Sequence, residues 1–124
     1  MNDLTSKEFR ESLQEAIDLF NNQKWYEAHD AFEDIWNDLV GDERQIVQGI
    51  LQVSVSQFHL NKGNLNGAMI LLGEGLGRIR NRFSEDLEID LLLLCSSLES
   101  LLSKLHENIP INKNDVPFLT KIKK

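Results

Sequence analysis

One histidine and two acidic residues stand close together in the stretch WYEAHDAFEDIW, residues 25–36. On a helix, His29 and Glu33 lie one turn apart, so they can share a ligand or hydrogen-bond each other. Asp30 points to a different side of such a helix. A zinc-protease helix needs a second histidine where Glu33 stands, together with a third ligand. We therefore interpret the stretch mainly as a packing helix with a polar edge.

A metal site on this stretch is the first chemical alternative. A carboxylate can stand where the second histidine is missing, because di-iron bundles use both His and Glu ligands. Those bundles carry Glu-x-x-His motifs, whereas His29 precedes Glu33 here and His59 has no glutamate three residues before it. We expect no metal and no other cofactor. The ligands of a metal-binding domain would be His29, Glu33 and His59.

A second polar feature follows in the segment 43–61, where Arg44, Gln48, Gln52 and His59 lie on one stripe of a mostly apolar helix. A solvent-facing stripe usually carries lysine and glutamate, and this stripe carries neither. The pattern therefore favours a semi-buried network with the carboxylates of the preceding helix. Such a network either fixes the register of the helices or lines a pocket for a small polar ligand.

Five helices must position these residues, because apolar side chains recur at helical spacing along most of the chain. Thr5 and Glu8 form a capping-box signature for the first helix, which ends at Asn21. Asp42 is the expected N-cap of the third helix. The later helices are predicted over residues 24–39, 43–61, 65–83 and 86–106.

Glycines and leucines characterise the last two predicted helices. Three glycines, at positions 73, 75 and 77, indicate either close helix approach or a bent second half of the fourth helix. Leucines at heptad-like spacing mark the fifth helix, and further leucines widen its stripe, which suits a bundle and leaves surface for a homodimer. The stripe consists of Leu87, Leu91, Leu94, Leu98, Leu101 and Leu105, widened by Leu92, Leu93 and Leu102.

The segments at the centre and the end of the chain suggest two further features. Ala28 and Ala68 occupy equivalent places in two similar hairpins, which gives the bundle tetratricopeptide-like character although the period differs. Residues 109–124 contain both prolines and are expected to form an extended C-terminal arm that is either packed on the bundle or partly mobile. The fold expected is thus an all-α compact bundle, a single domain over residues 1–124.

Composition limits the partners and the location. The net charge of −7 repels phosphate backbones, so we expect no nucleic acid. No uncharged apolar stretch approaches the roughly 20 residues that cross a bilayer, and no signal sequence is evident, so we expect no membrane and a cytoplasmic location. The single cysteine, Cys95, lies among leucines and is expected to be a core residue.

A longer pattern of residues, over about residues 15–80, resembles the domain-of-unknown-function 309 family. The pattern consists of Phe20-Asn21, Trp25-Tyr26-Glu27-Ala28-His29-Asp30, Glu33, Trp36, Gly41, Arg44, Gln48-Gly49, Gln52, His59, Gly63-Asn64 and Gly67-Ala68. The resemblance implies a compact all-α bundle from the prokaryotic cytoplasm or the plastid stroma, without an established activity. Asp30 departs from the family's usual glutamate, which puts a role for its shorter side chain in doubt.

The resemblance also implies a polar motif that includes the residues reached from helical spacing. We interpret the chain as a binding or interaction module whose partner is an unknown protein or a small polar ligand. The alternatives are a hydrolase-like enzyme that uses His29, Glu33, Arg44 and His59, and the metal-binding domain described above. The polar set, structural or functional, consists of Glu27, His29, Asp30, Glu33, Arg44, Gln48, Gln52 and His59.

Overall fold

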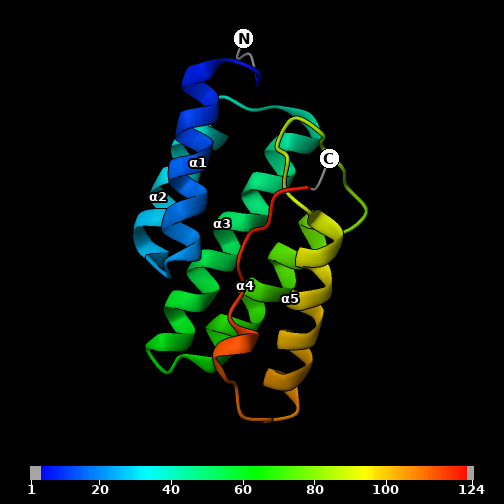
Figure 1. Ribbon diagram of the computed structural model, residues 1–124. Coiled ribbons are helices and arrows are strands. Elements are labelled where there is room, and N and C mark those ends of the chain that lie inside the picture. Colours follow the sequence, from blue (N-terminus) through cyan, green and yellow to red (C-terminus); the bar gives the residue numbers. More distant parts are fainter. Residues whose placement is uncertain (1–3, 123–124) are drawn as a thin grey trace.

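The computed structural model describes residues 4–122, which form a bundle of five α-helices and one short 3-10 helix (Figure 1). The all-α prediction is therefore confirmed. Each helix packs mainly against the helices before and after it in the chain, and the 3-10 helix η1 packs against the last of them. The elements are α1 (Lys7–Asn21), α2 (Trp25–Trp36), α3 (Gly41–Asn61), α4 (Leu65–Ile79), α5 (Leu91–His106) and η1 (Lys113–Asp115).

The core is continuous from α1 to the C-terminal arm. Phe20 at the end of α1 is fully buried and makes edge-to-face contacts with Trp25 at 5.0 Å and with Phe32 at 6.4 Å between ring centroids. Such aromatic pairs add about 0.5–1.5 kcal/mol to the stabilisation that burial alone provides. They fix the turn between α1 and α2. No helix of residues 4–122 is long and apolar enough to cross a membrane.

Helices α3 and α4 approach each other closely at two glycines. A Cβ atom added at Gly49 would lie 2.7 Å from the Gly75 carbonyl oxygen and 2.6 Å from Ile79 Cγ1. Near the other end of the contact, the Ser56 hydroxyl donates to the Ala68 carbonyl oxygen at 2.6 Å. Of the two explanations for the glycines of α4, close approach therefore holds at Gly75.

Three predicted helix boundaries were wrong. The fourth helix ends at Ile79 rather than at residue 83, and the fifth begins at Leu91 rather than at residue 86. The Asp90 side chain caps α5 by accepting from the Leu93 amide at 3.0 Å. Leu87 therefore lies in the loop before α5 and not in the helix. It fits the leucine pattern because its side chain is buried there. Likewise, α2 ends at Trp36 rather than at residue 39.

Two predicted caps also differ. Ser6, not Thr5, caps α1, because its hydroxyl oxygen accepts from the Phe9 amide at 3.1 Å. Helix α3 begins at Gly41, so Asp42 lies within its first turn and Val40 occupies the N-cap position. A positive φ of 63° at Gly41, which glycine adopts without steric cost, lets the chain turn sharply into α3.

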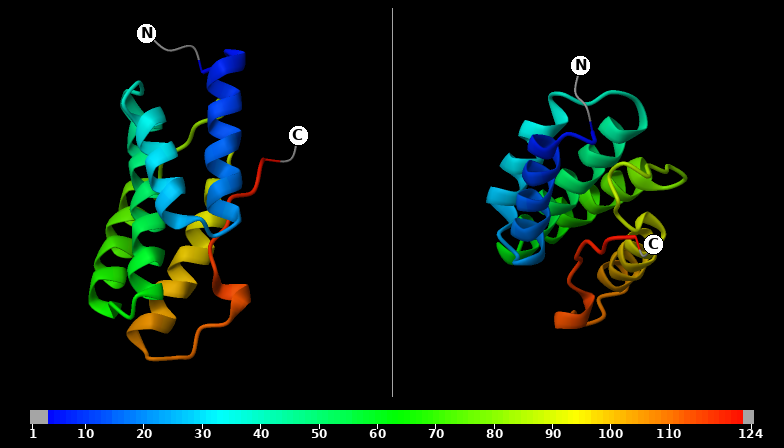
Figure 2. Two further views of the ribbon diagram at one scale, coloured as in Figure 1. Left: turned by 90° about the vertical axis from the view of Figure 1, so that its left-hand side faces the viewer. Right: turned by 45° about the horizontal axis from the view of Figure 1, so that its top comes forward.

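The last described residues, 107–122, return along the bundle from the end of α5 toward the end of α1 (Figure 2). The Asn21 side chain holds this arm: its Nδ2 donates to the Leu119 carbonyl at 2.9 Å, and its Oδ1 accepts from the Leu119 amide at 2.7 Å. Leu119 is buried, whereas the neighbouring Phe118 is 61% exposed. These two hydrogen bonds attach the arm to the last residue of α1.

Candidate functional site

The predicted polar residues of α2 lie on its outer side. His29 is half-buried, with Nε2 3.4 Å from Glu33 Oε2 and Nδ1 3.3 Å from Asp30 Oδ1. Both carboxylates are more than half exposed, so water screens these contacts. Glu27 is exposed. The predicted contact between His29 and Glu33 is therefore present, and Asp30 contacts the other ring nitrogen.

Arg44 has partners that the sequence did not predict. Its guanidinium carbon lies 3.8 Å from the centroid of a Trp36 ring, and its Nη1 donates to the Leu39 carbonyl at 3.1 Å. A planar guanidinium is weakly hydrated and stacks well on an indole ring. The stack closes the turn between α2 and α3.

The remaining members of the predicted set separate along α3. Gln52 Nε2 donates to Glu74 Oε1 on α4 at 3.4 Å, while Gln52 Oε1 is buried without a hydrogen-bond partner among the described residues. The side-chain Nδ2 of Asn64 lies 3.3 Å from His59 Nδ1. Gln48, one turn before Gln52 on α3, is half-buried.

Aromatic contacts, rather than hydrogen bonds, connect His29 with His59. Tyr26 lies 6.4 Å from the His29 ring and 6.0 Å from the Phe58 ring, and Phe58 lies 6.1 Å from the His59 ring, all between centroids. Within residues 4–122, no group of three or more His, Cys, Asp or Glu side chains is arranged to hold a metal ion. A functional role for the eight-residue set stays a prediction.

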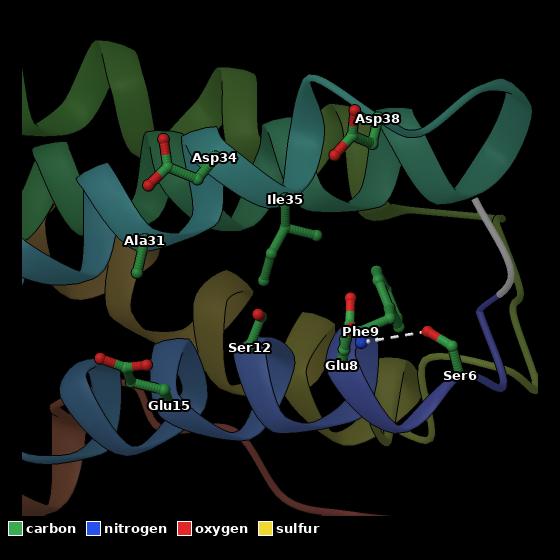
Figure 3. Close-up of a pocket in the computed structure, with 9 residues that line it drawn as sticks. All are labelled: Ser6, Glu8, Phe9, Ser12, Glu15, Ala31, Asp34, Ile35 and Asp38. Atoms are coloured by element: carbon green, nitrogen blue, oxygen red, sulfur yellow. Dashed lines mark hydrogen bonds between the residues drawn. The ribbon is translucent and has the colours of Figure 1, made fainter. Parts of the chain in front are cut away.

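A different site, which sequence reasoning missed, lies between α1 and α2. It is a groove of about 400 Å³ with an apolar floor and an acidic rim (Figure 3). We call it the acidic groove. Glu15 and Asp34 lie toward one end of the close-up, and Glu8 and Asp38 lie toward the other (Figure 3). Its lining consists of Ser6, Glu8, Phe9, Ser12, Glu15, Ala31, Asp34, Ile35 and Asp38.

Three of the four carboxylates of the acidic groove have no basic partner among the described residues. None of the ion pairs within residues 4–122 involves Glu8, Glu15 or Asp34. The basic residues of α1, Lys7 and Arg10, pair with Glu11 and Glu88 instead. A concave surface lined by one sign of charge concentrates oppositely charged groups from solution.

The signal for the acidic groove was present in the sequence. Glu8, Ser12 and Glu15 follow the spacing i, i+4, i+7, and Asp34 and Asp38 are four residues apart. Each set forms one stripe of the helices predicted from the sequence, although Asp38 lies in the turn after α2 in the structure. A short connection between the helices makes them antiparallel neighbours, which brings the two stripes together.

A comparison with known families finds a match in the middle of the chain. The model of the family described as "Domain of unknown function (DUF309)" matches residues 13–71. The resemblance to DUF309 is confirmed. The matched residues include all eight residues of the predicted polar set and the α2 side of the acidic groove, whereas Ser6, Glu8, Phe9 and Ser12 precede them. No curated protein and no solved structure matches the chain.

Proposed function

We propose that this chain is a binding module whose acidic groove accepts a positively charged segment of a partner protein. The observation that carries the proposal is the groove itself: carboxylates from two helices surround an apolar floor of Phe9, Ala31 and Ile35. Ammonium and guanidinium groups sit on aliphatic stems, so a lysine or arginine side chain offers both the charge and the apolar surface that this lining favours.

The spacing of the carboxylates favours two positive charges rather than one. Glu8 and Glu15 are seven residues apart on α1, which corresponds to about 10 Å along a helix axis. Two lysines three residues apart on an extended chain are separated by a similar distance, about 10 Å. Side chains three positions apart on an extended chain point to opposite sides, so one such lysine can face Glu15 on α1 at one end of the groove while the other faces Asp38 on the α2 side at the other end (Figure 3).

The exposure of the rim predicts a weak, salt-sensitive interaction. Glu8, Glu15, Asp34 and Asp38 are all exposed. Exposed ion pairs contribute about 0.2–1 kcal/mol each, and salt screens them. Such an interaction suits reversible recruitment.

The proposal is tested by titrating the protein with the peptide Lys-Gly-Gly-Lys at low ionic strength and following backbone amide signals by NMR. We expect shifts along both walls of the acidic groove, and weaker binding as salt is raised. The Glu15→Gln/Asp34→Asn double variant should bind about three- to tenfold more weakly, because two exposed ion pairs are lost.

A matched control keeps the change in net charge the same. Glu85 and Asp86 are exposed in the loop between α4 and α5, so Glu85→Gln/Asp86→Asn removes two carboxylates that do not line the groove. Equal weakening by the two double variants would show only a long-range charge effect and would refute the proposal. Equal binding of a peptide with acetylated lysines would refute it as well.

The predicted homodimer stays a separate proposal. Most of the leucine stripe of α5 is buried inside the bundle, but Leu92 is 87% exposed and Leu93 is 48% exposed. These two side chains are the leucine surface available to a second copy. Sedimentation velocity of the protein and of Leu92→Ser would test it, since a dimer through this surface should dissociate in the variant.

A further inference from the structure

A second groove lies on the other flank of α1. It encloses about 500 Å³ between α1, the loop before α5 and the C-terminal arm. Its floor is formed by the buried side chains of Leu13, Ile17 and Leu87. Ligand sites of this size are typically lined by apolar side chains with a few polar groups that set orientation. We call it the arm groove.

The arm places a lysine at the rim of this groove. Lys121 forms an isolated antiparallel bridge with Ile89, flanked by hydrogen bonds from the Asp90 amide to the Thr120 carbonyl at 2.7 Å and from the Ile122 amide to the Glu88 carbonyl at 2.9 Å. The backbone at Lys121 is therefore fixed on both sides. The last described residues of the arm lie beside the segment that leads into α5 (Figure 2).

The charges at the arm groove leave one cation available. Lys7 lies 3.9 Å from Glu11, and Arg10 pairs with Glu88, so both acidic residues of the lining already face a basic partner. Lys121 is exposed and takes part in no ion pair within the described part of the chain. A negative group at the rim would meet this ammonium group.

We propose that the arm groove binds a small amphiphilic carboxylate. The hydrocarbon part lies on Leu13, Ile17 and Leu87, where its burial gains about 25 cal/mol per Å² of apolar surface removed from water. The carboxylate pairs with the Lys121 ammonium group. An alkylammonium ion of the same length meets the like charge of Lys121 and is disfavoured at this rim.

The test uses octanoate as the probe, with octan-1-ol and octylamine as ligands of the same chain length and different charge. Backbone and methyl NMR signals report where each one binds. Octanoate should shift Leu13, Ile17, Leu87 and Lys121. Octan-1-ol should shift them at higher concentration, and octylamine should shift the acidic groove instead. Equal binding of all three at the arm groove, or no octanoate shift there at millimolar concentration, overturns the proposal.

A matched pair of variants tests the role of the lysine. Lys121→Gln should weaken octanoate binding about two- to fivefold, the range that an exposed ion pair supports. Lys113→Gln removes an exposed lysine elsewhere on the same arm and should leave binding unchanged. Equal weakening in the two variants would mean that only net charge matters and would overturn the assignment to Lys121.

Discussion

The two grooves on either side of α1 differ in charge and in how the chain builds them. The acidic groove uses two helices that follow each other directly, and its rim carries four carboxylates. The arm groove joins α1 to the loop before α5 and to the end of the chain, and its rim carries three basic residues and two acidic ones. One amphipathic helix therefore presents opposite charge preferences on its two flanks.

Ligand binding at the two grooves should therefore depend on different parts of the structure. Glu8 and Glu15 lie on one flank of α1, and Lys7 and Arg10 lie on the other. The acidic groove needs only the α1–α2 hairpin, whose turn is fixed by the contact between Phe20 and Trp25. The arm groove also needs the C-terminal arm to be docked. Substitutions can separate these requirements.

The largest expected effect comes from the scaffold that both grooves share. Gly49→Ala should lower the free energy of unfolding by about 1–3 kcal/mol, because its Cβ would lie 2.7 Å from the Gly75 carbonyl oxygen and α3 must move away from α4. Urea denaturation followed by circular dichroism measures this change. Peptide and octanoate binding should remain in the folded variant, because Gly49 lines neither groove.

A second glycine in the same pair of helices provides the control. A Cβ added at Gly77 meets nothing within 4 Å, so Gly77→Ala should be neutral or stabilise the protein by up to about 1 kcal/mol through helix propensity. If Gly77→Ala destabilised the protein as much as Gly49→Ala, close packing between α3 and α4 would not be the cause.

The next effect separates the grooves. Asn21→Ala removes both hydrogen bonds to Leu119 and should cost about 1–2 kcal/mol, at roughly 1 kcal/mol for each bond. Because the arm then loses its tie to α1, octanoate binding should fall while binding of Lys-Gly-Gly-Lys is retained. Isothermal titration with both ligands measures the two affinities on one sample.

The neighbouring asparagine is the matched control for this change. Asn22 Nδ2 donates to the Asp18 carbonyl within its own helix and does not reach the arm. Asn22→Ala should therefore leave octanoate binding intact. Loss of peptide binding in Asn21→Ala would contradict the independence of the two grooves.

The sequence predicted local features of this fold better than long-range ones. Helical spacing identified all five helices, and the contact between His29 and Glu33 followed from their one-turn separation. The tie between Asn21 and Leu119 joins residues 98 positions apart, and no local pattern marks such a pair. The arm groove was therefore beyond sequence reasoning, whereas the acidic groove could have been found from two acidic stripes.

The partner of Arg44 was mispredicted for a physical reason. Charge alone favoured a carboxylate of α2, but Trp36 ends that helix directly beside the start of α3. A guanidinium stacks on an indole and still donates to a carbonyl, here that of Leu39 at 3.1 Å. The side chain therefore closes a turn. Aromatic residues near a helix end compete with carboxylates for arginine, and spacing rules do not weigh that competition.

The smallest effect is a pH dependence confined to the arm. The Asn112 amide donates to Asp115 at 3.0 Å and the Lys104 ammonium lies 2.7 Å from it, and these two contacts hold the pKa of Asp115 below its usual value of 3.8. A carboxyl whose pKa is lower in the folded state stabilises that state above its unfolded pKa and loses this contribution as pH falls through the folded value. Below about pH 4, η1 should therefore loosen from α5, and amide hydrogen exchange at residues 112–116 should accelerate while exchange in α1 and α2 does not.

Asp115→Asn should show the faster exchange already at neutral pH, whereas Asp86→Asn, on an exposed loop residue, should not. Equal acceleration in the α1–α2 hairpin would mean that acid weakens the whole bundle and that η1 has no separate sensitivity.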